Sequence, residues 1–335
     1  MIKNKSLFIL LLIFSVISSI YNYKFFEANI GQRKLQRIIG SGVYDFSQEE
    51  LSRWSVDYPS LNNTAIPIKS LLGAYYITHD SIIKGVELLE KGSSENPFIG
   101  YEDMLRAKLY ESLGEKDSFE LYARSANRKL PNSAAHYILL ARLYIQEQKI
   151  DSLEYYFNTI SRNTRDEEVW KVYLTTMVTN KKFTDSINVK ENAIKAKNLF
   201  PKNEQITLSA NYVLHGIENV KKSIKLRQQA IDSFSNSPSK SIEYLKDALD
   251  LVPDNIKNYE SLIEILFSLE KYREIINIYN LLNEMKLTTF GLPVIEYIGL
   301  SYLNLQDVER GCYLINLLKP YGYEVSETAN LICNQ

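Results

Sequence analysis

The stretch AKLYESLGEKDSFELYARSANRKLPNSAAHYILLARLY, residues 107–144, begins and ends on nearly the same four letters. Ala107 and Tyr110 recur 34 residues later as Ala141 and Tyr144. Other positions repeat with the same step: Gly73 and Tyr76 before this stretch, then Leu89, Ala123 and Phe157, and finally Pro97 and Pro131. A fixed period of this length indicates a stack of short structural units.

Two packed helices per unit explain these residue types. A small residue such as Ala107 lets the first helix approach the second closely, and Tyr110 lies on the same face and fills the adjoining space. Pro131 stops the second helix, because proline lacks an amide hydrogen and disfavours helix at the residue before it. The period and the residue pattern resemble the tetratricopeptide repeat (TPR). The resemblance implies an all-α, right-handed superhelical TPR-like solenoid.

The pattern divides the chain into four parts. Repeat positions continue through residues 61–324 and predict about seven helix pairs, interrupted by an additional helix near 203–220. Residues 325–335 are expected to cap the stack, because an exposed apolar end favours association. A membrane helix at 1–23 and a membrane-proximal connection at 24–60 are expected to precede the array.

The first 25 residues differ from the rest of the chain. Lys3 and Lys5 precede an apolar run from Leu7 to Ile20. At about 1.5 Å per residue, this run is at the short limit for crossing a bilayer. We expect an uncleaved signal-anchor. A cleaved signal peptide, for which Ile17-Ser18-Ser19 is a weak cleavage pattern, and a merely buried helix are the alternatives.

The charges that flank the apolar run bear on its orientation. They are Lys3 and Lys5 on one side and Lys24, Arg33, Lys34 and Arg37 on the other. The positive-inside rule alone favours a cytoplasmic repeat region, whereas a short apolar run behind two lysines is typical of an export signal. We expect a single-pass protein of the bacterial cytoplasmic (inner) membrane with periplasmic repeats. A cleaved, periplasmic protein is the alternative.

Composition and motifs exclude several classes of function. The 335 residues are 45% hydrophobic and 24% charged, which excludes wholesale disorder. With 39 basic and 40 acidic residues, nothing indicates nucleic-acid binding. His79, His136 and His215 lie far apart, and no zinc, phosphate-loop or nucleophile motif is present. We therefore expect no enzyme activity, no cofactor and no metal.

The two cysteines leave two alternatives open. Cys312 falls in the last predicted helix pair and Cys333 in the predicted cap, 21 residues later. A cap that folds back would bring them together, and a bridge in an oxidising compartment would stabilise the terminal repeat. Two separate buried thiols are the simpler expectation, because sequence alone cannot place the Cα atoms within bridging distance.

The TPR resemblance implies that first helices line a concave groove. The residues expected to bind a partner there are Tyr101, Lys108, Ile138, Arg142, Ile145 and Lys171. The three basic residues favour an acidic or carboxylate-bearing ligand. The alternative is that they are solvated charges paired with neighbours such as Glu111 or Glu168. A later part of the groove is expected to be acidic, around Glu260, Glu264 and Glu296.

A second resemblance concerns residues 45–160. The segments Tyr58-Pro59-Ser60-Leu61 and Pro131-Asn132-Ser133, with the repeats beside them, are similar to the helical-repeat tail or companion of bacterial O-antigen ligase and polymerase membrane proteins. A multi-span catalytic domain is missing, so ligase activity is not implied. The sequence therefore favours a membrane-anchored protein-binding scaffold in envelope or surface-polysaccharide assembly. The alternative is a non-catalytic accessory subunit of a multi-span membrane enzyme.

Overall fold

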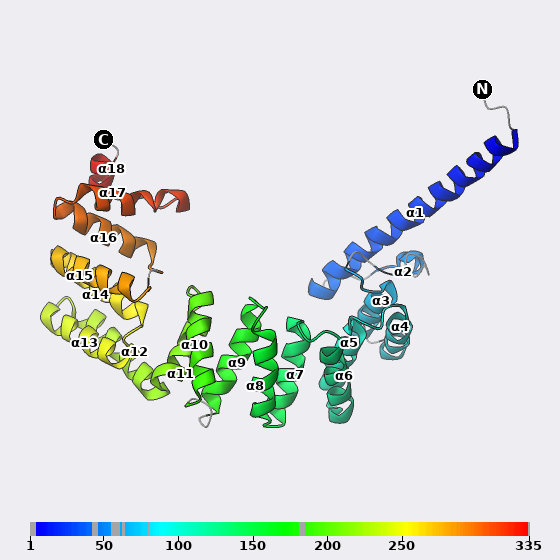
Figure 1. Ribbon diagram of the computed structural model, residues 1–335, viewed down its shortest axis with the longest axis horizontal. Coiled ribbons are helices and arrows are strands. Elements are labelled where there is room, and N and C mark those ends of the chain that lie inside the picture. The colour runs from blue at the N-terminus through cyan, green and yellow to red at the C-terminus, as the bar shows by residue number, and fades with distance from the viewer. Residues whose placement is uncertain are drawn as a thin grey trace. The chain divides into compact units, whose positions relative to one another are not determined.

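The computed structural model describes residues 5–41, 46–54, 61, 64–79, 81–180, 185–287 and 289–333 (Figure 1). Residues 42–45 and 55–60 of the expected connection lie outside this part. The described residues are helical and contain no strand beyond a single bridge between Leu61 and Pro67. The chain forms two compact units, Met1–Tyr173 (unit 1) and Leu174–Gln335 (unit 2).

Unit 1 consists of successive helices that pack in pairs, α3 with α4, α5 with α6 and α7 with α8. Their bounds are α1 (Lys5–Ser41), α2 (Gln48–Trp54), α3 (Ile68–Thr78), α4 (Ile82–Glu95), α5 (Tyr101–Leu113), α6 (Lys116–Lys129), α7 (Ala134–Gln146) and α8 (Ile150–Ile160). Helix α9 (Glu167–Thr179) crosses the division between the units. The second helices of the pairs begin at Ile82, Lys116 and Ile150, which confirms the 34-residue period.

Unit 2 repeats this architecture with the pairs α12 with α13, α14 with α15 and α16 with α17. The bounds are α10 (Ile187–Leu199), α11 (Glu204–His215), α12 (Ile217–Ser233), α13 (Pro238–Leu251), α14 (Ile256–Ser268), α15 (Tyr272–Glu284), α16 (Leu292–Asn304), α17 (Val308–Asn316), the 3₁₀ turn η2 (Lys319–Tyr321) and α18 (Glu327–Cys333). Helix α11 packs between α10 and α12 and lies where the extra helix is expected. The all-α, TPR-like solenoid expected from the sequence is confirmed.

The turns inside four of the described helix pairs close in the same way. The amide of Lys149 donates to Tyr144 O at 2.9 Å, and Gln148 before it has a φ of 57°. This is the 6→1 hydrogen bond of a Schellman motif, in which the residue before the donor adopts a left-handed conformation. Equivalent turns contain Gly114 in unit 1 and Glu270 and Gln306 in unit 2. Most of these left-handed residues are not glycine, so the helix pair itself imposes the conformation.

Prolines end the second helices as the sequence predicts. The amide of Leu130 donates to Ala126 O, and Leu130 leaves the helical region with ψ 77° because Pro131 follows it. The same geometry recurs at Asn96 before Pro97, Phe200 before Pro201 and Val252 before Pro253. Each carbonyl that accepts this bond belongs to a glycine or alanine, which keeps the end of the helix narrow for stacking.

Two pairs of glycines bring helix backbones into contact. A Cβ on Gly73 would lie 2.8 Å from Gly85 O, and a Cβ on Gly85 would lie 2.8 Å from Gly73 O. Gly299 and Gly311 repeat this relation near the C-terminus, at 3.2 and 3.0 Å. A side chain at the crossing of α3 and α4 would therefore collide with backbone, and one at the crossing of α16 and α17 would require neighbouring atoms to shift.

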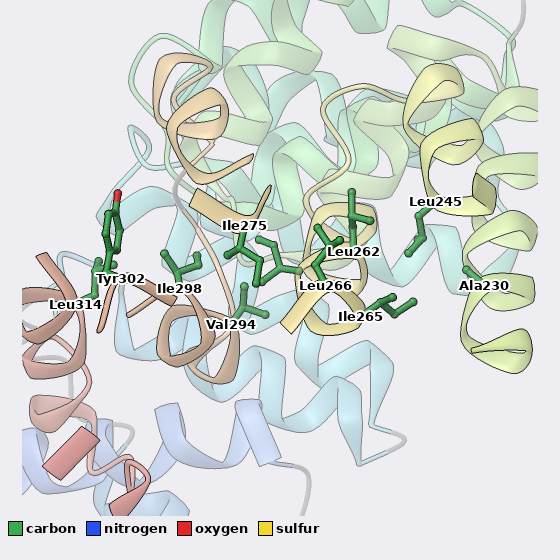
Figure 2. Packing of buried hydrophobic residues seen from close by; sticks show 11 residues of the cluster. Ala230, Leu245, Leu262, Ile265, Leu266, Ile275, Val294, Ile298, Tyr302 and Leu314 are labelled. Carbon is green, nitrogen blue, oxygen red and sulfur yellow. The ribbon is translucent and has the colours of Figure 1, made fainter. Parts of the chain in front are cut away.

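A continuous apolar core runs through unit 2. It contains side chains from six successive helices, beginning with Ala230 on α12 and ending with Leu314 on α17 (Figure 2). Leu262, Ile265 and Leu266 occupy its middle and are at most 5% exposed. Each helix therefore contributes to a core shared with both neighbours, as the nearest-neighbour logic of solenoids requires.

Helix α1 has two different ends. Leu7 to Phe26 expose their apolar side chains to solvent, and this is the one described helix long and apolar enough to cross a membrane. The same helix continues without a break to Ser41 and buries Leu35 completely against α2 and α3. The expected membrane helix and the start of the expected connection are thus one helix.

The cysteines form a disulfide. Cys312 on α17 and Cys333 on α18 are bonded, with Cα atoms 5.1 Å apart. The expectation of two separate thiols is therefore wrong, because α18 folds back over α17 as a cap. Two hydrogen bonds to Glu296 hold the connecting loop, from Tyr323 Oη at 2.9 Å and from the Ser326 amide at 2.7 Å.

Candidate binding surface

The expected binding residues lie on three first helices of unit 1. Tyr101 and Lys108 belong to α5, and Ile138, Arg142 and Ile145 belong to α7, which packs directly against α5. Lys171 lies on α9. Lys108, Arg142 and Ile145 are exposed, whereas Tyr101, Ile138 and Lys171 are half-buried. The structure therefore brings five of the six residues onto two adjacent helices.

Two of the three basic side chains have carboxylate partners. Arg142 Nη1 lies 3.3 Å from Glu111 Oε2 on α5, and Lys171 pairs with Glu168 one turn earlier. These are the two partners named in the alternative interpretation. Such half-exposed pairs contribute about 0 to 1 kcal/mol, so a ligand carboxylate can exchange with them at little cost.

Tyr101 lies at the buried edge of this surface. Burial and the neighbouring Glu102 raise its pKa to about 12, so the phenol remains a neutral donor. Glu102 is fully buried, and burial raises the pKa of its carboxyl, which accepts a hydrogen bond from Ser70 of the preceding repeat. Tyr101 is thus positioned by the joint between two repeats.

The acidic groove expected around Glu260 and Glu296 has a structural role instead. Glu260 Oε1 accepts the Gly291 amide at 2.6 Å, and Glu296 Oε1 accepts the Ser326 amide. The Gly291 amide precedes α16 and the Ser326 amide precedes α18, and both glutamates are more than nine-tenths buried. Glu264 is the exposed member of the expected set, and partial desolvation raises the pKa of its carboxyl.

A charged network in unit 2 was not expected from the sequence. Lys197 on α10 pairs with Asp254, 57 residues later, and donates to Asn211 Oδ1 at 2.7 Å. His215 Nε2 lies 2.7 Å from the other oxygen of Asp254. Burial acts to raise the pKa of Asp254, but the His215 hydrogen bond and the Lys197 charge outweigh it and hold the pKa at about 2.

The three histidines have unrelated surroundings. His79 stacks on Tyr75, His136 is buried with a pKa lowered by desolvation, and His215 bonds Asp254. Among the residues that the structure describes, no group of three or more metal-ligating side chains occurs.

No family model matches the chain, and no curated protein matches it in sequence. Similar solved structures include a tetratricopeptide repeat protein from Parabacteroides merdae, with a TM-score of 0.37 and 11% identity over 79% of this chain and 96% of that chain. The TPR domain of P58(IPK) has a TM-score of 0.32 and 11% identity over 78% and 94%. A chain of the APC/C hetero-tetramer Cut9-Hcn1 has a TM-score of 0.30 and 17% identity over 87% and 60%. The recurring helix starts, left-handed turns and proline stops of the chain itself make its fold a TPR-like solenoid.

Proposed function

We propose that the protein is a membrane-anchored, non-catalytic scaffold. It binds a protein partner through the α5–α7 surface of unit 1, by which we mean Tyr101, Lys108, Ile138, Arg142 and Ile145, together with Lys171 on α9. The observation that carries this proposal is helix α1, which joins an exposed apolar stretch to the core of the first repeat through Leu35. A soluble protein rarely exposes so long an apolar surface. We therefore place the apolar side chains of Leu7–Phe26 in contact with lipid rather than with water.

The proposed topology places the repeats on the outer, periplasmic side of a bacterial cytoplasmic membrane. The Cys312–Cys333 disulfide supports this side, because such bonds persist in oxidising compartments. Leu35 follows Phe26 by nine residues, a rise of about 14 Å along a helix. The first repeat therefore lies near the lipid headgroups, within reach of a partner embedded in the same membrane.

The partner class follows from this placement. A component of an envelope or surface-polysaccharide assembly fits the scaffold role. A multi-span enzyme of the O-antigen ligase or polymerase type fits the alternative, in which the repeats form an accessory subunit. Protein identification after purification of the full chain in mild detergent separates the two.

The topology gives the first prediction. We expect the full chain to remain with membranes after an alkaline wash, and protease added outside the cytoplasmic membrane to digest the repeats. Fractionation and blotting with an antibody against unit 2 measure both. A soluble product that lacks about the first 19 residues would show cleavage instead, and protected repeats would show the opposite orientation.

The binding surface gives the second prediction. Replacing Lys108, Arg142 and Lys171 together by alanine should reduce partner capture about tenfold, because these charges steer an acidic ligand. The melting temperature should stay unchanged, because the broken surface pairs contribute little. Capture is measured by quantitative mass spectrometry of proteins that co-purify with the tagged full chain.

The matched control replaces three exposed basic residues on second helices, Lys91, Lys116 and Arg128. This variant should capture as much partner as the unmodified chain. Equal capture by both triple variants, with equal melting temperatures, would remove the α5–α7 surface from the proposal.

A further inference from the structure

Helix α11 forms one wall of two adjoining cavities in unit 2. The first has a volume of 420 Å³ and extends from α10 to the loop between α15 and α16. The second has a volume of 340 Å³ and lies between α11, α12 and α14. Both are lined by Pro201, Thr207 and Ile256, so they form one depression along α11 (the α11 groove).

The α11 groove contains polar groups that the fold leaves without partners. Arg227, half-buried on α12, lines the second cavity, and no carboxylate oxygen of the described residues lies within 4.0 Å of its guanidinium nitrogens. Burial lowers the pKa of Arg227, and the charges of Glu260 and Glu204 act against this shift. Thr207 Oγ1 at the shared wall is enclosed and has no hydrogen-bond partner in the described part of the chain. Partially buried donors of this kind gain most from an added acceptor.

The charge of the lining favours an acidic ligand. Four basic side chains line the groove, namely Lys197, Arg227, Lys257 and Lys286, against the carboxylates of Glu204 and Asp254. Asp254 is already bonded to Lys197 and His215. Glu260, which lies outside the lining, is engaged by Lys257 at 3.0 Å and by the Gly291 amide.

The groove also offers exposed apolar surface beside the charges. Ile194 is 51% exposed and Met285 38% in the first cavity, and Leu208 is 37% exposed in the second. The network of Lys197, Asp254, His215 and Asn211 fixes α10 and α11 against the start of α14, so the walls are preorganised.

We propose that the α11 groove binds an extended peptide segment in which a carboxylate side chain stands close to an apolar one. The carboxylate receives the paired N–H groups of Arg227, which lines the second cavity. The apolar side chain covers Ile194 and Met285. This site consists of unit 2 residues alone, so its test and the test of the α5–α7 surface have independent outcomes.

The experiment selects ligands from a displayed library of random twelve-residue peptides on the immobilised full chain in detergent. Enriched peptides are then synthesised with a fluorescent label and titrated by anisotropy. We expect enriched sequences to combine Asp or Glu with a neighbouring aliphatic residue. Arg227→Gln should raise their Kd by about tenfold or more, the expected loss of a charge-assisted hydrogen bond.

Three further variants make the result specific. Arg273→Gln changes an exposed arginine on α15 and should leave the Kd unchanged. Arg227→Lys keeps the charge but loses the bidentate hydrogen-bonding geometry. Its effect on the Kd should therefore fall between those of Arg227→Gln and Arg273→Gln. Ile194→Ser, which removes an exposed apolar side chain of the groove, tests the site should Arg227→Gln lower the melting temperature. No enrichment, enrichment of basic peptides, or equal Kd values for Arg227→Gln and Arg273→Gln would overturn the proposal.

Discussion

Replacing Phe157 by alanine is expected to lower the free energy of unfolding by about 3 to 5 kcal/mol, the cost of emptying a large buried aromatic site. Phe157 on α8 is fully buried and contacts rings from two other helices. Its ring stacks on Tyr173 with centroids 3.6 Å apart, meets Trp170 edge to face at 5.0 Å and lies 6.2 Å from Tyr137. The cavity would open at the joint between α7, α8 and α9, where a solenoid has no other core to compensate.

Chemical denaturation of the full chain in detergent, followed by circular dichroism, measures this effect. Tyr155→Ala is the matched control, because Tyr155 lies on the same helix but is 68% exposed. It should change the unfolding free energy by less than about 1 kcal/mol. Similar losses for both variants would mean that the aromatic cluster does not stabilise unit 1.

Removing the disulfide should have the second largest effect. Replacing Cys312 and Cys333 by serine opens a link across 21 residues and is expected to cost about 3 kcal/mol in the last repeat. Without the link, the buried Ala329 and the hydrogen bonds of the preceding loop to Glu296 still hold α18 in place. We expect amide hydrogen exchange in α18 to accelerate strongly while α12 to α14 remain protected.

Reduction of the unmodified chain provides the internal control. It should reproduce the exchange pattern of the double serine variant, and the variant itself should not respond to the reductant. Two titratable thiols per unfolded, unreduced chain would contradict the bridge.

The helix pairs could be predicted from the sequence because they depend on residues that act locally. The small residues at Gly73 and Ala107 and the stop at Pro131 each act within one helix or one turn, so their spacing alone reveals the pairs. The left-handed turn at Gln148 was not predictable in the same way, because nothing in a glutamine favours positive φ. The turn is held there by packing of the two helices that it connects.

Long-range pairings were the part that could not be predicted. Lys197 meets Asp254 across the extra helix and a complete pair, at a separation that no repeat period suggests. Glu260 and Glu296 stand at places assigned to the groove, yet they accept backbone amides of the following repeat and of the cap, respectively. Burial and the partner atoms, not residue type, decide whether such a carboxylate binds a ligand or joins two repeats.

Because helix α1 is unbroken, the number of residues between its membrane segment and the first repeat sets the orientation of the repeats. An α-helix turns by about 100° and advances about 1.5 Å with each residue. On the proposed topology, the number of residues between Phe26 and Leu35 therefore determines which way the α5–α7 surface faces around the membrane normal. One inserted residue would rotate that surface by more than a quarter turn but would move it only about 1.5 Å further from the membrane. An insertion of seven residues would return the surface to within about 20° of its original orientation around the membrane normal.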